Sequence, residues 1–144
     1  MPRDFKKIFL DTSPIIYFMD DDKLFKDKTE KILWDFLSRD VCLITSVITE
    51  AEYLTYHYKI GNEGALKSFW NFLNGASVLL YPIRADISER AAKIRADYPS
   101  FKLPDALQLA TACISGCDLF LTNDKQLKQF KEIPCMTIEE WELI

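Results

Sequence analysis

Five short apolar runs divide the chain, and segments with helical spacing of apolar residues separate them. The runs are rich in Ile, Leu, Val and Phe, the residue types that favour strands. They cover residues 8–10, 41–45, 78–81, 119–122 and 135–138. Strands that alternate with helices predict a mainly parallel sheet covered on both faces. We therefore expect an α/β fold, a three-layer α/β/α sandwich with five strands, in one domain over residues 1–144.

The segments between the runs carry the start and stop signals of helices. Ser13 before Pro14 predicts an N-cap followed by proline at the first helical position. Gly61 predicts a break between two helices, and Pro104 and Gly116 predict the start and the end of another. The expected helices cover residues 24–37, 47–58, 65–73, 86–96 and 104–116, with a short one at 125–130 and a terminal turn at 139–143.

The composition is that of an ordinary globular protein, with 49% hydrophobic and 28% charged residues. A net charge of −4 and a pI of about 5.0 disfavour a sequence-blind nucleic-acid binder, although an enzyme can meet RNA locally. No run approaches the ~20 apolar residues of a membrane span. The run before Asp11 is too short for a signal peptide. We therefore expect a cytoplasmic protein with no membrane association.

The cysteines and the single histidine give little support to a thiol or imidazole site. Cys42 and Cys135 lie inside apolar runs, and Cys113 and Cys117 lack the CxxC spacing of a zinc site. We expect all four to be buried free thiols. His57 lies in a polar stretch and is expected at the surface. With one histidine, catalytic triads and histidine-rich metal sites have little support.

Four acidic residues stand near the ends of the expected strands. Asp11 ends the first strand, Glu52 lies on the helix after the second, Asp105 opens the helix before the fourth, and Asp124 follows the fourth. Right-handed crossovers would bring all four to the carboxyl edge of the sheet, where ligands bind in such folds. Clustered carboxylates need protons or cations between them, and all-oxygen ligands suit Mg²⁺ or Mn²⁺. Such a site can activate water to attack a phosphodiester.

Each of these acids also has a local alternative. Asp11 can be a turn residue, although Ser13 would already supply the cap. Glu52 can close a capping box with Thr49. The other two acids can complement the dipoles of the helices that follow them.

At these residues the sequence resembles the PIN-domain family, in particular the VapC-like toxins of prokaryotic toxin–antitoxin pairs. The matching segments are LDTS at 10–13, TSVITEAE at 45–52, LPDALQLATA at 103–112 and LTND at 121–124, within a resemblance that covers residues 8–138. In the second segment the acid after the alanine is the functional one in the family, which selects Glu52 over Glu50. Gln126 stands where many members carry a further acid, and this weakens the case for a second metal ion but not for the site.

The resemblance implies cleavage of single-stranded RNA that depends on Mg²⁺ or Mn²⁺. It also implies a homodimer and a cognate antitoxin that blocks the site. By the family's pattern, Asp11, Glu52 and Asp105 hold metal. Asp124 helps to position the metal or the attacking water.

Further residues have supporting roles by the same resemblance. Thr122 and Asn123 would support the acid cluster, and so would Ser46, for which a helix cap is the alternative. Lys125 and Lys128 follow the fourth acid and could meet RNA phosphate, with a solvated helix face as the alternative.

Two expected helices carry more aromatic area than surface helices need. The residues are Trp34, Phe36, Phe69, Trp70 and Phe72. Large exposed apolar patches mark partner surfaces, so we expect some of these to form a dimer interface or an antitoxin groove. The alternative is that all of them complete the core.

Three other function classes can be weighed against the nuclease. A response-regulator receiver needs a phosphoacceptor aspartate after the third strand, where this chain has Tyr81, Pro82 and Ile83. A haloacid-dehalogenase-type phosphatase needs a second aspartate two residues after Asp11, where Ser13 stands. A non-catalytic PIN-fold binding or scaffold module is the remaining alternative. The four retained acids favour the enzyme.

Overall fold

The five strands run in the same direction in one sheet. The structure, a computed structural model, describes residues 4–143. The strands are β1 (Lys7–Leu10), β2 (Cys42–Ser46), β3 (Val78–Tyr81), β4 (Leu119–Thr122) and β5 (Cys135–Thr137). Their spatial order is β3-β2-β1-β4-β5, and each neighbouring pair is parallel. The predicted five-stranded parallel sheet is therefore confirmed.

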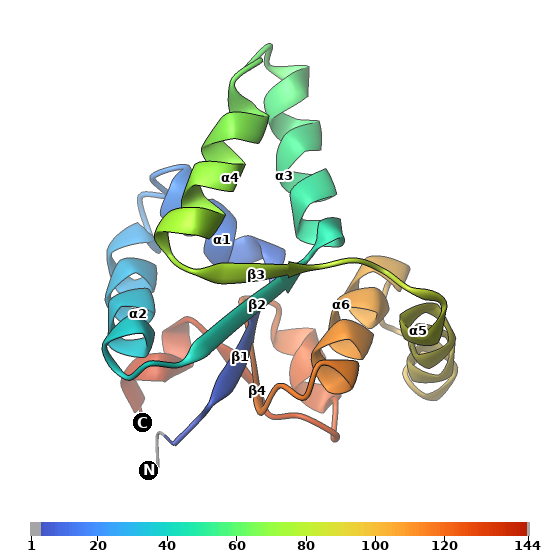
Figure 1. Cartoon of the computed structure of the whole chain (residues 1–144). Helices are drawn as coiled ribbons and strands as arrows, with labels where there is room; N and C mark the ends of the chain where they lie inside the picture. Colours follow the sequence, from blue (N-terminus) through green and yellow to red (C-terminus); the bar gives the residue numbers. More distant parts are fainter. Residues whose placement is uncertain (1–3, 144) are drawn as a thin grey trace.

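Helices cover both faces of this sheet and complete a three-layer sandwich, as predicted (Figure 1). They are α1 (Thr12–Met19), α2 (Lys26–Ser38), α3 (Val47–Lys59), α4 (Ala65–Gly75), α5 (Ala85–Asp97) and α6 (Leu103–Ile114), with short 3-10 helices η1 (Lys125–Gln129) and η2 (Glu139–Leu143). One apolar core joins the sheet to α1, α2 and α4, and a second joins it to α5 and α6. Helices α3 and α4 extend away from the sheet as a hairpin (Figure 1). No helix among residues 4–143 has both the length and the apolar character needed to cross a bilayer.

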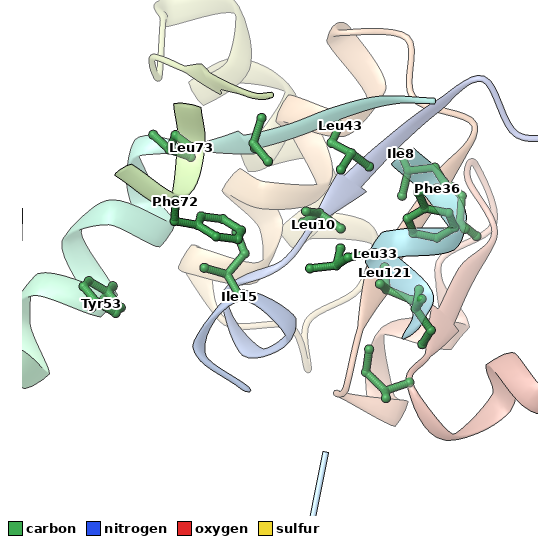
Figure 2. Packing of buried hydrophobic residues seen from close by; sticks show 14 of the residues in the cluster. Ile8, Leu10, Ile15, Leu33, Phe36, Leu43, Tyr53, Phe72, Leu73 and Leu121 are labelled. Atoms are coloured by element: carbon green, nitrogen blue, oxygen red, sulfur yellow. The ribbon is translucent and has the colours of Figure 1, made fainter. Parts of the chain in front are cut away.

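The strands are apolar throughout because both of their faces are buried. Successive side chains of a strand point to opposite faces. Ile8 and Leu10 of β1 therefore lie in the core under α1 and α2 (Figure 2). Phe9, between them, lies in the opposite core and stacks on Phe120 of β4 with ring centroids 5.1 Å apart.

The topology fixes where a ligand can bind. From β1 the chain builds one side of the sheet through β2 and β3, and then crosses to the other side through β4 and β5. The connections leaving β1 and β4 therefore diverge to opposite sides at the carboxyl edge. In open α/β sheets such a switch point is the usual ligand site. Asp11 and Asp124 follow these two strands.

Two expected helix starts are wrong, for one physical reason. The N-cap of α1 is Asp11, whose carboxylate accepts a hydrogen bond from the Thr12 N–H at 2.9 Å, so Ser13 is already helical. Helix α2 begins at Lys26, because Asp22 first holds a turn by accepting from the Leu24 and Phe25 N–H groups. In both places an aspartate captures backbone donors that the apolar spacing does not reveal.

The expectation for His57 is also wrong, and that for the cysteines holds in part. His57 is buried between α1 and α3 rather than exposed. All four cysteines are free thiols as expected. Only Cys117 is fully buried, and the other three are half-buried.

Candidate functional site

Asp11 is the most deeply buried of the four acids, at the point where β1 passes into α1. One carboxylate oxygen, Oδ1, accepts from the Thr12 N–H, and the other, Oδ2, accepts from the Thr122 hydroxyl of the neighbouring strand at 2.8 Å. Burial, together with the negative charges of Asp105 and Glu52, raises the pKa of Asp11 to about 6 despite these hydrogen bonds. The neighbouring acids thus repel the negative charge of the Asp11 carboxylate.

The Glu52 side chain, on α3, lies close to Asp11. The Thr12 hydroxyl, next to Asp11, donates to Glu52 Oε1 at 2.6 Å. The alternative of a capping box between Thr49 and Glu52 is wrong. Ser46 is the N-cap of α3, and Thr49 turns its hydroxyl into the buried interior instead.

Asp105 and Asp124 complete the cluster from α6 and from the end of β4. Asp105 accepts from the Lys102 N–H at 3.3 Å, and Asp124 accepts from the Gln126 N–H at 3.0 Å as the N-cap of η1. These are the local roles that the sequence left open. Burial raises the pKa of Asp105, and the charges of Asp124 and Glu52 raise it further. The structure therefore brings Asp11, Glu52 and Asp105 within electrostatic reach of one another, and Asp124 within reach of Asp105.

Gln108 is the main site residue that sequence reasoning missed. Its side chain is fully buried on α6, one turn after Asp105. Its Nε2 donates to Thr49 Oγ1 at 2.8 Å and lies 3.5 Å from Asp11 Oδ1, while its Oε1 accepts from the Ser46 hydroxyl. A glutamine within the otherwise apolar stripe of this helix was the available signal, because a buried amide needs several hydrogen-bond partners.

Threonine hydroxyls extend the same buried network beneath the acids. Thr45 donates to the Leu10 carbonyl and lies 2.8 Å from Thr49 Oγ1. The hydroxyls of Thr49 and Thr12 are 3.1 Å apart. Both the Thr45 and the Thr49 side chains are completely buried. This hydrogen-bond network joins β1, β2, α1, α3 and α6. The orientation of the acids therefore depends on elements far apart in sequence.

The three predicted supporting residues differ in what they contact. Ser46 caps α3, which was the alternative role, and its hydroxyl also donates to Gln108. Thr122 binds Asp11 and accepts from the Asp124 N–H at 3.1 Å. Asn123 donates to the Tyr17 hydroxyl at 2.8 Å and so ties this loop to α1.

The four acids suit a divalent metal by their ligand chemistry. Hard cations such as Mg²⁺ and Mn²⁺ prefer carboxylate oxygens. Within residues 4–143, no three acidic, imidazole or thiol side chains converge closely enough to hold an ion as they stand. Glu52, Asp105 and Asp124 each accept a hydrogen bond from a nearby donor instead. Each of these hydrogen bonds uses one carboxylate oxygen, so the other oxygen is available to an ion once the side chains move closer to Asp11.

The two predicted RNA-binding lysines are both paired with acids of η2. Lys125 Nζ lies 3.7 Å from Glu139, and the Lys125 side chain is 76% exposed. Lys128 pairs with Glu140, which also accepts from the Thr137 hydroxyl. Lys125 is therefore the more exposed and the more loosely paired of the two lysines.

Comparison with known proteins identifies the family. Residues 8–133 match the PIN domain. The chain belongs to the PIN domain family. The match includes all four acids and Gln108. Among curated proteins, none matches the sequence significantly.

Solved structures share the fold of this PIN domain. A chain of VapBC2 from Rickettsia felis, bound to a DNA fragment from its promoter, has a TM-score of 0.74 and 16% identity, covering 91% of this chain and 98% of that one. DNA-bound VapBC from Salmonella typhimurium gives 0.74 and 18%, covering 92% and 98%. VapC20 from Mycobacterium tuberculosis, described as a Sarcin-Ricin loop cleaving toxin, gives 0.65 and 21%, covering 88% and 98%. At these identities the likeness establishes the fold.

Proposed function

We propose that this PIN domain is a divalent-metal-dependent endoribonuclease that cleaves single-stranded RNA in the cytoplasm, as the toxin of a toxin–antitoxin pair. The observation that carries the proposal is the buried carboxylate of Asp11, surrounded by like charges at the switch point of the sheet. Such an arrangement costs stability unless a cation or a proton neutralises it. VapC20, which has this fold, is described as a Sarcin-Ricin loop cleaving toxin, and this supports a nucleic-acid cleaving activity.

The position of each side chain suggests a separate role in the reaction. Asp11, Glu52 and Asp105 would hold Mg²⁺ or Mn²⁺, which supplies an activated water and neutralises charge on a phosphodiester. Asp124, which follows β4, would orient the attacking water. Thr122 would keep Asp11 aimed at the site through the hydrogen bond to Oδ2.

A cleavage assay tests this function. Purified protein is incubated with a fluorescently labelled single-stranded RNA of mixed sequence, with Mn²⁺, with Mg²⁺ or with a chelator. We expect internal cleavage with either metal and none with the chelator. Binding of RNA without cleavage under all metal conditions would instead favour the non-catalytic PIN-fold module.

We also propose that an apolar hollow between α1, α2 and α4 binds the antitoxin. The hollow has a volume of about 270 Å³, and Phe18, Leu33, Trp34, Phe72 and Ala76 are among its lining residues. Trp34 is 63% exposed beside this hollow, so its ring is accessible to a partner that binds there. The VapBC complexes that share this fold support a protein partner of this kind.

The aromatic residues of α2 and α4 fall into two groups. Phe36, Phe69 and Phe72 are buried core residues, whereas Trp34 and Trp70 are exposed. The exposed pair offers the larger area to a partner, and Phe72 contributes only where it lines the hollow. We propose that Trp70 takes part in a homodimer, and light scattering tests this: wild type should be dimeric and Trp70→Asp monomeric but still cooperatively folded.

A further inference from the structure

A second hollow lies along the seam between α1 and α3, away from the four acids. The two helices run side by side in the same direction, because Thr12 contacts Glu52 near their start and Asp20 contacts His57 near their end. A helix rises ~1.5 Å per residue, so Asp20 lies roughly 12 Å along α1 from Thr12. One RNA strand is therefore long enough to contact both the acids and this hollow.

This seam hollow combines aromatic walls with acidic side chains, among them Asp20, whose side chain is 24% exposed. Its volume is about 560 Å³, and it is lined by Ile16, Asp20, Tyr53, Tyr56, His57 and Ile60, among others. Tyr56 is more than half exposed, so one ring face is open to a ligand. Small-molecule sites have this size and this mixture of apolar walls with few polar groups.

Hydrogen bonds hold the acid and the histidine of the seam hollow in place. The Asn62 amide donates to His57 Nδ1 at 3.1 Å, which leaves the His57 proton on Nε2. Nε2 in turn donates to the Asp20 carboxylate, 3.0 and 3.1 Å from its two oxygens. One proton does not saturate a carboxylate, so Asp20 keeps acceptor capacity for a ligand.

Tyr53 supplies an independent observation that points to a ligand. Its side chain is 3% exposed and lines the seam hollow, yet its hydroxyl makes no hydrogen bond with any residue in the described range 4–143. The hydroxyl oxygen itself is not among the buried unpaired atoms, so it is open to the hollow and available to a ligand there. Burial raises the pKa of Tyr53, and the charge of Asp20 raises it further. The hydroxyl therefore keeps its proton and can donate it.

We propose that the seam hollow binds a guanine base of the RNA substrate, next to the nucleotides at the cleaved bond. Tyr56 stacks on the base, Asp20 accepts from its N1–H and N2 amino groups, and the Tyr53 hydroxyl donates to O6. Proteins recognise single-stranded RNA through such stacking and contacts to the Watson–Crick edge. The proposal rests on the ribonuclease activity proposed above and names its base preference.

The chemistry of the lining favours guanine over other occupants. Among the four RNA bases, only guanine presents two adjacent donors and an acceptor along its Watson–Crick edge. An arginine side chain offers donors alone and would leave the Tyr53 proton unused. The acids here also have cationic or donor partners already, since Asp21 pairs with Lys26 at 2.6 Å and Asp20 with His57. Because these partners offset the negative charge of the acids, the hollow favours a neutral base over a cation.

The single histidine makes a direct binding test possible. His57 lines the seam hollow, and its ring signals in an NMR spectrum can come from no other residue. Wild-type protein is titrated with guanosine, and with inosine, which lacks only the N2 amino group. We expect guanosine to shift the His57 signals in a saturable way, and inosine to bind roughly tenfold more weakly, because one hydrogen bond to a charged acceptor is lost.

Three variants test the assigned contacts. Tyr56→Ala should weaken guanosine binding at least about fivefold by removing the stacking ring. Tyr53→Phe should weaken it about threefold by removing one hydroxyl. Tyr58→Ala is the matched control, because Tyr58 is exposed on the same helix but does not line the hollow. It should bind guanosine as wild type does.

Three results overturn the proposal: His57 signals that guanosine does not move, equal affinity for guanosine, inosine and uridine, or Tyr56→Ala binding as wild type. If acetyl-arginine amide binds in place of guanosine, the hollow is a docking site for a basic protein side chain instead. The titration needs no cleavage, so its outcome is separate from that of the RNA assay. Cleavage without guanosine binding rejects the base pocket alone, and guanosine binding without cleavage rejects the nuclease alone.

Discussion

The two ends of the α1–α3 seam both carry aspartates, but in opposite electrostatic surroundings. At the start of α1, Asp11 lies within reach of Glu52 and Asp105, which have its own charge. At the end of α1, Asp20 accepts a hydrogen bond from His57. The charge of Asp11 remains repelled until a cation or a proton neutralises it. The charge of Asp20 already has a hydrogen-bond donor, His57, within the chain.

The difference shows how a fold keeps acids ready for a ligand. Beneath Asp11 the supporting groups are neutral: the hydroxyls of Thr12 and Thr122 and the amide of Gln108. Neutral donors orient a carboxylate without neutralising its charge, so its attraction for a cation is preserved. A basic side chain in the same place would compete with the metal. The seam hollow, with histidine and lysine beside its aspartates, is suited to a neutral ligand.

The largest expected effect comes from the matched pair Asp11→Asn and Asp20→Asn. Asp11→Asn should lower RNA cleavage by about 100-fold or more and abolish the rise in melting temperature with Mn²⁺, because a ligand is lost. Without metal it should be as stable as wild type or more stable, since a like charge is removed. Asp20→Asn should instead lose roughly 1 kcal/mol, because the hydrogen bond from His57 loses its charged acceptor. Thermal and urea unfolding with a chelator measure both signs.

Asp105→Asn is the second test of repulsion, because burial and like charges raise the pKa of Asp105 too. It should also lose metal-dependent stabilisation while remaining folded. A large loss of metal-free stability in Asp11→Asn or Asp105→Asn would falsify the repulsive cluster and make these acids structural.

The second prediction separates two neighbouring glutamates of α3. Their side chains point about 200° apart, because each helical residue turns ~100°. Glu52 binds the Thr12 hydroxyl beside Asp11, so only Glu52 faces the site. Glu52→Gln should therefore abolish cleavage, and Glu50→Gln should keep most of it. Similar rates for the two variants in the RNA assay contradict this placement, as does the reverse order.

The sequence predicted most of the fold because its signals are local. Apolar runs and helical spacing locate the strands and the helices after α1 to within a few residues, and both faces of the sheet are apolar. For α1 the sequence supplied only a start signal. The errors lie where a side chain captures backbone groups. Asp11 caps α1 in place of Ser13, and Asp22 delays the start of α2. Propensity cannot choose between two neighbouring capping residues.

The acids could be placed from the sequence because strand ends in a parallel sheet share one edge. The residues beneath them could not. Gln108 meets Thr49 and Ser46 across three elements, and such contacts depend on helix packing rather than on spacing. His57 was misjudged for the same reason, because its partner Asp20 lies 37 positions away in the sequence.

The third prediction uses pH to compare the same two ends. Burial and like charges raise the pKa of Asp11 from 3.8 to about 6 in the folded protein. The fold thus favours the protonated form, so Asp11 contributes its full stability below about pH 4 and loses it as pH rises through 6. The metal-free free energy of unfolding should fall by roughly 3 kcal/mol over this range, at 1.36 kcal/mol per pKa unit.

Urea titrations between pH 4 and pH 7 in a chelator measure this fall. Asp11→Asn should flatten most of it, whereas Asp20→Asn should retain it, because the change belongs to the acid cluster. Mn²⁺ should restore stability at pH 7 in wild type only when Asp11 is intact. A wild-type profile that is flat, or that rises with pH, contradicts the repulsive cluster.

The smallest expected effect concerns the lysines near the two ends. Lys26 pairs with Asp21 at 2.6 Å, whereas Lys125, close to the acid cluster, lies 3.7 Å from Glu139 and is mostly exposed. A loosely paired lysine can leave its partner to bind phosphate, and one such contact contributes modestly and in a salt-dependent way. Lys125→Ala should therefore weaken RNA binding about threefold at low salt and less at high salt. Lys93→Ala, an exposed lysine on α5, is the control and should have no effect. Fluorescence anisotropy with the cleavage-impaired Asp11→Asn protein measures binding without loss of the RNA. If both lysine variants bind as the parent does, the acid cluster engages RNA without Lys125.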